Sequence, residues 1–346
     1  MNFSAIPTER LPELLRSMPK AELHLHIEGS LEPELMFALA RRNRLVLPHA
    51  DVAAVRHAYA FTNLQSFLDI YYAAASVLLH EADFYDLAWA YLQRAAADRV
   101  VHVEMFFDPQ THTQRGVAMH TVVAGLHQAC EDARRQLGVD AQLIMCFLRH
   151  LSEDDAFETL DQAMPYLDKL VAVGLDSSEL GHPPEKFARV FARARELGLR
   201  CVAHAGEEGP PAYIWSALDD LQAQRIDHGV QATQDTALMQ RLAAQRVPLT
   251  VCPLSNVKLC VFPDLAQHNL PALLDAGLCA SVHSDDPAYF GGYVNDNLLQ
   301  SFAALPLHAG HAHQLARNSF EASFASPAQK QRWVAELDAC FARFGA

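Results

Sequence analysis

The chain has 346 residues, of which 51% are hydrophobic, and it carries a formal net charge of −14 at pH 7. This length and composition predict a globular protein with a large core. The acidic balance argues against nucleic acid as a partner, because binding phosphates requires a basic face.

Segments that direct export or membrane insertion are not expected. The first twenty residues contain Glu9 and Glu13 as well as Pro7 and Pro12, which interrupt the apolar stretch of a signal peptide. The most apolar later segment, residues 70–79, is far shorter than the roughly 20 residues of a membrane helix and predicts a buried helix. The seven cysteines are scattered without a C-x-x-C pair, which is typical of reduced thiols. We therefore expect a cytoplasmic protein with no membrane partner.

Short β-rich segments alternate with amphipathic helical segments along the chain. Strands are expected at residues 22–26, 100–107, 142–148, 171–177, 200–204, 225–228, 248–252 and 278–283. Helices are expected at residues 31–42, 64–97, 117–137, 185–197, 236–244 and 308–346. Ser152 and Asp155 have the spacing of a capping box at the start of a further helix.

Repeated strand-to-helix units predict parallel strand pairing. Eight such units without a linker rich in Gly, Ser or Pro favour an α/β fold of the closed (β/α)8 TIM barrel type over an open doubly wound sheet, which usually has fewer strands. We expect a single domain over residues 1–346, with the barrel core at about residues 20–300 and additional helices packed outside it at about 308–346.

Polar side chains stand at or just past the C-terminal ends of four expected strands. His24 and His26 end the first strand, His204 the fifth and His228 the sixth, and Asp285 follows the eighth. Barrel enzymes carry their chemistry at this edge. Side chains of the first and last strands converge most readily if those strands are neighbours. These positions therefore favour a closed barrel over an open sheet.

His24 and His26 are two residues apart, so in an extended strand both point to the same face and can grip one cation. The H-x-H pattern alone is weak, because 18 histidines in 346 residues predict about one copy by chance. A second copy, His311 and His313, falls in an expected helix, where residues two apart diverge. For the first copy, the alternative is a pair of hydrogen-bonded core histidines.

His204 and Asp285 would complete the first pair as a set of three nitrogen ligands and one oxygen ligand. Such a set leaves room for a water molecule at a catalytic Zn2+ ion, which lowers the pKa of that water. The same set also accepts Fe, Co or Mn. The sequence therefore predicts a hydrolase with one metal ion per chain.

Two acidic residues follow His204 in a small-residue turn. Glu207 can reach the pocket there and is the candidate general acid. Glu208 precedes Gly209-Pro210-Pro211, which suits a helix start, so it is expected to favour that helix N-terminus.

His228 and Asp286 complete the candidate residues. A histidine beside a metal-bound water can act as an orienter or as a base, although Asp227 and His228 could also form a buried pair. Asp286 stands next to Asp285 and can turn toward another part of the pocket. Solvated surface aspartates are the alternative, and the following Pro287 and the aromatic, glycine-rich loop argue against it.

Other hydrolase patterns are excluded by the motifs. His26-Ile27-Glu28 matches the H-x-E half of the nucleobase deaminase signature, but the P-C-x-x-C half is missing. The patterns G-x-x-x-x-G-K, G-x-S-x-G and H-E-x-x-H do not occur, which argues against P-loop, serine-hydrolase and zincin enzymes.

Five motifs together resemble the adenosine/adenine deaminase family over nearly the whole chain. They lie at residues 22–29, 204–207, 225–229, 252–256 and 284–287. The resemblance implies a (β/α)8 barrel that holds Zn2+ and binds a small purine substrate. It assigns the residues as follows: His24, His26, His204 and Asp285 as metal ligands, Glu207 as proton donor to the purine N1, His228 as the residue that steers the hydroxide, Asp286 as the contact to N7, and the backbone N–H of Gly181 as the contact to N3.

Departures from the nucleoside-deaminating branch indicate a free-base substrate. That branch typically has Asp after the second ligand histidine, where this chain has Glu28, whose longer side chain could occupy the ribose volume. Residues 181–184 and 284–293 also resemble the adenine deaminase branch. We therefore expect hydrolysis of adenine to hypoxanthine and ammonia, in purine salvage or catabolism. The alternatives are deamination of adenosine or of N6-substituted adenine at the same site, and a catalytically silent metal-binding barrel.

Overall fold

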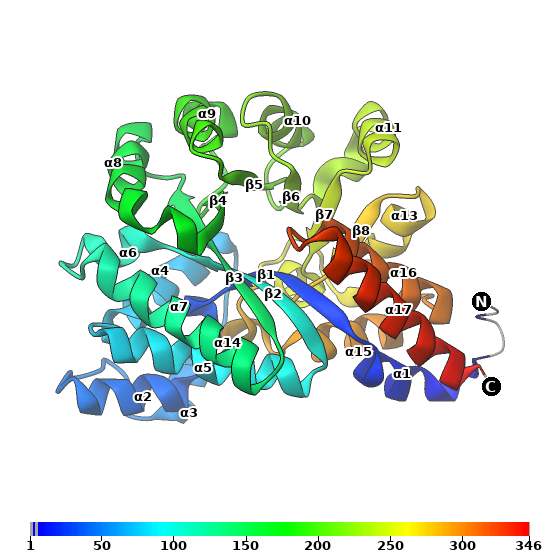
Figure 1. Cartoon of the computed structure of the whole chain (residues 1–346), viewed down its shortest axis with the longest axis horizontal. Coiled ribbons are helices and arrows are strands. Elements are labelled where there is room, and N and C mark those ends of the chain that lie inside the picture. Colours follow the sequence, from blue (N-terminus) through cyan, green and yellow to red (C-terminus); the bar gives the residue numbers. More distant parts are fainter. Residues whose placement is uncertain (1–2, 4–5, 346) are drawn as a thin grey trace.

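The computed structural model describes residue 3 and residues 6–345. Its centre is one sheet of eight parallel strands that lie side by side in sequence order (Figure 1). The strands are β1 (Lys20–His26), β2 (Val100–Phe107), β3 (Asp140–Leu148), β4 (Leu170–Asp176), β5 (Arg200–Ala205), β6 (Arg225–His228), β7 (Pro248–Val251) and β8 (Cys279–Val282). All eight expected strands are confirmed, with ends that differ by no more than two residues.

The last strand returns to the first and closes the barrel. Leu25 of β1 forms a parallel bridge with Asp285, three residues beyond the end of β8. The His26 N–H donates to the Asp285 carbonyl at 3.0 Å, and the Asp285 N–H donates to the His24 carbonyl at 3.1 Å. The predicted (β/α)8 barrel is therefore confirmed, and the bonds that close it lie at the end that carries the histidines.

Helices surround the strands, and α8, α9, α10 and α11 follow one another along the rim in Figure 1. The helices are α1 (Leu11–Ser17), α2 (Pro33–Arg42), α3 (Val52–Ala58), α4 (Leu64–Ala74), α5 (Glu81–Ala97), α6 (Pro109–Thr113), α7 (Met119–Gln136), α8 (Glu153–Ala163), α9 (Ala188–Glu196), α10 (Pro211–Asp219), α11 (Thr236–Gln245), α12 (Pro253–Lys258), α13 (Leu270–Asp275), α14 (Pro287–Phe290), α15 (Val294–Ala304), α16 (Ala309–Ala322) and α17 (Pro327–Phe344). Short 3-10 turns are η2 (Thr8–Arg10), η3 (Glu28–Ser30), η4 (Ala75–Val77), η5 (Met164–Lys169), η6 (Pro184–Phe187), η7 (Val230–Gln234) and η8 (Leu265–Gln267).

The single helix expected over residues 64–97 is wrong, because the chain breaks between α4 and α5. The Asp83 carboxylate accepts the backbone N–H groups of Leu79 and His80 and so starts a new helix at Glu81. An ion pair with Arg42 of α2 holds Asp83 in place. Hydrophobic periodicity continues across this break, so the pattern alone does not reveal it.

Two other expectations about helices are confirmed. The Ser152 side chain and the Asp155 side chain each accept the other's backbone N–H, so a capping box opens α8. The C-terminal region is helical: α16 packs against β1 and β8, and α17 packs against α16.

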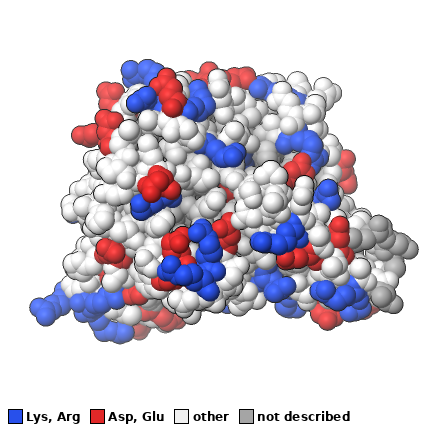
Figure 2. All heavy atoms as spheres, in the orientation of Figure 1, with Lys and Arg blue, Asp and Glu red and all other residues white. Residues whose placement is uncertain are grey.

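Charged residues occupy the barrel interior as well as the surface. Arg225 is fully buried and pairs with Glu104 at 2.5 Å and with Asp227 at 3.3 Å, so its charge is compensated inside the barrel. On the face in Figure 2, basic and acidic side chains lie intermixed. No helix among the described residues is both long and apolar enough to cross a bilayer.

Candidate metal centre and pocket

The four predicted metal-binding side chains meet at the C-terminal end of the barrel. His26 Nε2 lies 3.0 Å from His204 Nε2 and 3.5 Å from Asp285 Oδ1. His24 Nε2 lies 3.2 Å from the same Asp285 oxygen. One atom from each residue falls within 4.8 Å of all the others, and all four residues are buried. The arrangement therefore offers three nitrogens and one oxygen to a single point.

In each of the three histidines, the ring nitrogen that points away from the shared centre faces a separate partner. His204 Nδ1 donates to the carbonyl of Leu175 at 3.1 Å. His24 Nδ1 lies 2.9 Å from Thr250 Oγ1, whose own proton goes to Asp227, so the threonine oxygen accepts from the histidine. With the ring protons committed outward, the Nε2 lone pairs of these two rings point to the shared centre.

These inward lone pairs fit a metal ion. His26 Nδ1 faces Asp176 Oδ2 at 3.5 Å, so His26 Nε2 also presents a lone pair, toward the Nε2 of His204. Two lone pairs 3.0 Å apart repel unless a cation lies beside them. In addition, the buried Nε2 of His24 has no hydrogen-bond partner. A cation bound here satisfies all of these atoms at once.

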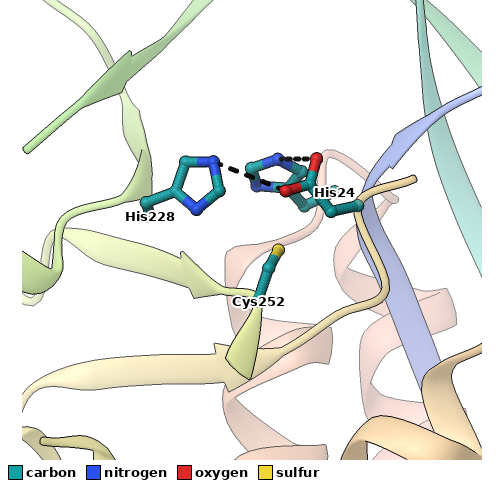
Figure 3. Close-up of side chains that lie close together, drawn as sticks. His24, His228 and Cys252 are labelled. Atoms are coloured by element: carbon teal, nitrogen blue, oxygen red, sulfur yellow. Dashed lines mark ion pairs between the residues drawn. The ribbon is translucent and has the colours of Figure 1, made fainter. Parts of the chain in front are cut away.

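A second group around His24 contains His228, Cys252 and Asp285, whose ligand atoms also lie within 4.8 Å of one another. Figure 3 shows His24, His228 and the Cys252 thiol close together. Burial raises the pKa of Cys252 well above its usual range, which disfavours the thiolate that a metal ligand requires. The set with three histidines and Asp285 is therefore the stronger candidate.

The electrostatics of the centre also suit a cation. Burial lowers the pKa of His204 well below its usual range, and neighbouring His24 and His26 add to the effect, so the ring is neutral as a ligand must be. Burial acts to raise the pKa of Asp285, but the histidines around it, His24 first, hold that pKa well below its usual range. Asp285 also has a left-handed backbone, with φ +64°, which is unusual without glycine.

Glu207 lies in the turn after β5 and is buried beside the centre. Its Oε2 lies 3.6 Å from His228 Nε2, and its Oε1 has no hydrogen-bond partner. Burial, followed by the charges of Asp285 and Glu179, raises the pKa of Glu207 well above its usual range. The raised pKa favours the protonated form of Glu207.

Glu179 holds this turn and was not singled out from the sequence. Its carboxylate accepts the backbone N–H groups of four successive residues, 206 to 209, at 2.6, 3.1, 2.8 and 2.7 Å. No local pattern reveals this role, because Glu179 stands 28 residues before Glu207 and meets it only across β4 and β5.

The expected role of Glu208 needs a correction. It does cap a helix N-terminus, but the helix is α4 and not the α10 that follows it in sequence. Glu208 Oε1 accepts the backbone N–H of Leu64, the first residue of α4, at 3.1 Å. The turn held by Glu179 therefore places this side chain at the first residue of α4.

A pocket opens beside the metal centre. Its walls combine apolar side chains of α4 with carboxyl groups from strand ends. The lining residues are His26, Leu64, Phe67, Leu68, Tyr71, Tyr72, Asp108, Asp176, Ser177, His204, Glu207, His228, Leu259, Asp285 and Asp286. Asp108 and Asp176 were missed in the sequence, although each stands at the C-terminal end of a strand, the same signal that selected the histidines.

The three predicted substrate contacts have different positions. Asp286 lines the pocket, and its Oδ1 is buried without a partner. Gly29 permits this position, because a Cβ there would lie 1.8 Å from Asp286 Oδ1. Glu28 and Gly181 are not among the described lining residues.

Glu28 lies behind the pocket wall. Its Oε1 accepts from His112 Nε2 at 2.7 Å and from the backbone N–H of Asp108 at 3.3 Å. Its Oε2 meets the Tyr71 hydroxyl at 3.5 Å. Gly181 lies in the turn after β4 with a left-handed backbone, φ +82°. The structure thus gives Glu28 the geometry of a support for Asp108 and Tyr71.

The class of protein follows from the barrel fold and from comparison with known proteins. The family model described as adenosine deaminase matches residues 19–340, so the chain belongs to the adenosine deaminase family.

Individual relatives are similar over nearly the full length. An adenine deaminase of Albidiferax ferrireducens is 66% identical over 344 residues, which are 99% of this chain and 100% of that protein. The crystal structure of an adenine deaminase from Arthrobacter aurescens has a TM-score of 0.92 at 52% identity and covers 93% of this chain and 99% of that chain. An amidohydrolase from Burkholderia ambifaria, solved with bound Zn, has a TM-score of 0.89 at 26% identity and covers 96% of this chain and 93% of that chain.

Proposed function

We propose that this protein hydrolyses adenine to hypoxanthine and ammonia with one bound Zn2+. The observation that carries the proposal is the convergence of three Nε2 lone pairs and the Asp285 carboxylate beside Glu207, whose raised pKa favours a proton and whose Oε1 has no hydrogen-bond partner. The names of the similar proteins, adenine deaminase at 66% and 52% identity, support the choice of substrate. Three nitrogens and one oxygen form a set that zinc prefers, and Fe, Co or Mn are possible substitutes.

The side chains around the centre then have separate roles in the reaction. A divalent cation held by the three histidines and Asp285 would supply an activated water near neutral pH. Glu207 donates its proton to the purine N1, which makes C6 accept the oxygen. The bond from C6 to the amino nitrogen then breaks, the proton of the oxygen added at C6 passes to that nitrogen, and ammonia leaves while C6 becomes a carbonyl. A positioned acid of this kind contributes roughly 10² to 10⁴ in rate.

Asp286 and His228 orient the reactants. Burial, followed by the charge of Asp285, raises the pKa of Asp286 well above its usual range, which favours the protonated form that can donate to the N7 lone pair. His228 Nε2 faces Glu207 and Asp285 at 3.6 and 3.8 Å, where it can contact the attacking oxygen.

The acidic wall of the pocket favours the free base over the nucleoside. Asp108 Oδ1 and Asp176 Oδ1 are buried without partners, and a hydrogen-bond donor on the substrate would satisfy them. Free adenine offers an N–H on its five-membered ring. In adenosine that nitrogen carries ribose and offers no donor.

A substrate panel on purified, metal-quantified protein tests the proposal. We expect the highest kcat/KM for adenine and lower values for adenosine and 9-methyladenine. The panel also includes N6-methyladenine. Faster turnover of adenosine would overturn the choice of substrate, and faster release of methylamine would show an N6-substituted substrate. Bound metal with no turnover of any aminopurine would establish the silent metal-binding barrel instead.

A variant of Asp108 tests the recognition of the ring N–H. Asp108→Asn should lower kcat/KM for adenine by about tenfold, as expected for the loss of one hydrogen bond. The rate with 9-methyladenine, which lacks this N–H, should change little. Asp154→Asn makes the same substitution at an exposed position of α8 and serves as the matched control. An equal loss with both substrates would remove Asp108 from this role.

A further inference from the structure

A line of buried hydrogen bonds runs behind His228, away from the pocket. Asn256 Nδ2 lies 3.4 Å from His228 Nδ1, and Asn256 Oδ1 lies 3.2 Å from His268 Nε2. His268 Nδ1 in turn accepts the backbone N–H of Leu270 at 3.0 Å. Asn256, His228 and His268 are at most 3% exposed, so water does not replace any of these partners.

The donor and acceptor of each hydrogen bond in this line follow from the bond between the Leu270 N–H and His268. A backbone N–H can only donate, so His268 Nδ1 is an acceptor and the proton of the neutral ring sits on Nε2. That proton goes to Asn256 Oδ1, which leaves the amide NH2 of Asn256 to face His228. The amide donates to His228 Nδ1, so His228 carries its proton on Nε2.

Packing keeps the line in this one arrangement. The backbone carbonyl of Asn256 accepts the backbone N–H groups of Val261 and Phe262 at 2.8 and 3.1 Å. The ring of His268 packs on Phe262, with ring centroids 4.4 Å apart. Burial also lowers the pKa of His268 to about 4, which keeps its ring neutral.

We propose that Asn256 and His268 are positioning residues that fix His228 as the tautomer with its proton on Nε2. The role that this inference gives to His228 in the reaction rests on the proposed function. With Nε2 protonated and Nδ1 already occupied, His228 donates a hydrogen bond into the pocket and has no free lone pair with which to accept a proton. His228 therefore orients the attacking oxygen and does not act as the base, a choice that the sequence leaves open.

The tautomer can be observed without any activity measurement. In zinc-loaded protein labelled with 15N-histidine, NMR distinguishes a protonated from an unprotonated ring nitrogen, and the His228→Gln spectrum identifies the signals of His228. We expect Nε2 protonated and Nδ1 unprotonated. Asn256→Asp replaces the donor by a carboxylate, so Nδ1 of His228 should gain a proton. A protonated Nδ1 in the wild-type protein would overturn the proposal, even if adenine is turned over.

Kinetics of paired variants test the contribution of His268 and remain informative if Asn256→Asp fails to fold. His268→Leu removes the donor to Asn256, whereas His268→Gln keeps an amide donor. We expect His268→Leu and Asn256→Asp to lower kcat roughly 10²-fold or more, with KM and bound metal little changed, and His268→Gln to recover most of the rate. His120→Leu, on the exposed face of α7, is the matched control. Equal rates for the Leu and Gln variants would show that the donor has no role.

Discussion

Glu179 offers the sharpest test of how the fold supports the site, because one carboxylate holds the whole turn that carries Glu207. Its Oε2 accepts three backbone N–H groups and its Oε1 accepts a fourth. Glu179→Gln keeps the shape of the side chain but replaces one oxygen by an NH2 group. That group would face a backbone N–H, so one bond is lost and two donors oppose each other.

The expected cost follows from these four bonds. A hydrogen bond to a charged group contributes about 1.5 to 3 kcal/mol, and an unsatisfied buried donor costs about 1 to 3 kcal/mol. Glu179→Gln should therefore lower the free energy of unfolding by about 3 kcal/mol, and Glu179→Ala by more than about 4 kcal/mol. Because a shift of about 1 Å in a reacting group can cost 10²-fold in rate, kcat should fall by about that factor.

Urea unfolding and steady-state kinetics on metal-quantified protein measure both effects. The metal content should stay near one equivalent, since Glu179 does not contact the candidate ligands. Glu158→Gln makes the same change at an exposed position of α8 and is the control. The reasoning would be refuted if Glu179→Gln had the unfolding midpoint and the kcat of this control.

Three further outcomes are expected. Glu207→Ala should lower kcat by roughly 10² to 10⁴ while one equivalent of metal stays bound, as measured by metal analysis, and full activity would remove Glu207 from the mechanism. His204→Ala should lose both metal and activity, and a retained equivalent of ion would contradict the ligand set. Burial of Lys20 lowers its pKa from 10.5 to about 7, so the unfolded chain holds more protons between these pH values and the free energy of unfolding should rise with pH across that window. Lys20→Met should flatten that rise in urea unfolding curves, and an unchanged slope would show that Lys20 is not the cause.

Much of the barrel is encoded locally. Buried parallel strands are short apolar runs between amphipathic segments. The alternation of these runs with segments of helical periodicity therefore predicts all eight strands and their order. The same reading misses the break before Glu81, because the cap that creates it depends on Asp83 and its partner Arg42 from another helix.

The sequence also determined most of the candidate metal centre. His24 and His26 share a face of one strand, and His204 and Asp285 stand at the ends of others, so the rule that barrel sites lie at the C-terminal edge predicts their meeting. Which ring nitrogen faces the centre was not predictable. That choice depends on Thr250, Asp176 and the carbonyl of Leu175, which reach the histidines from neighbouring strands.

Only the tertiary structure decided the supporting residues. Glu179 reaches the turn of Glu207 across 28 positions, and Glu28 lies behind the pocket because His112 holds it there. Asn256 contacts His228 by crossing from α12 to the end of β6. Hydrogen bonds of this kind join residues that are distant in sequence and close only after folding. A sequence read one segment at a time shows which groups can donate and accept, and the packed barrel determines which of them meet.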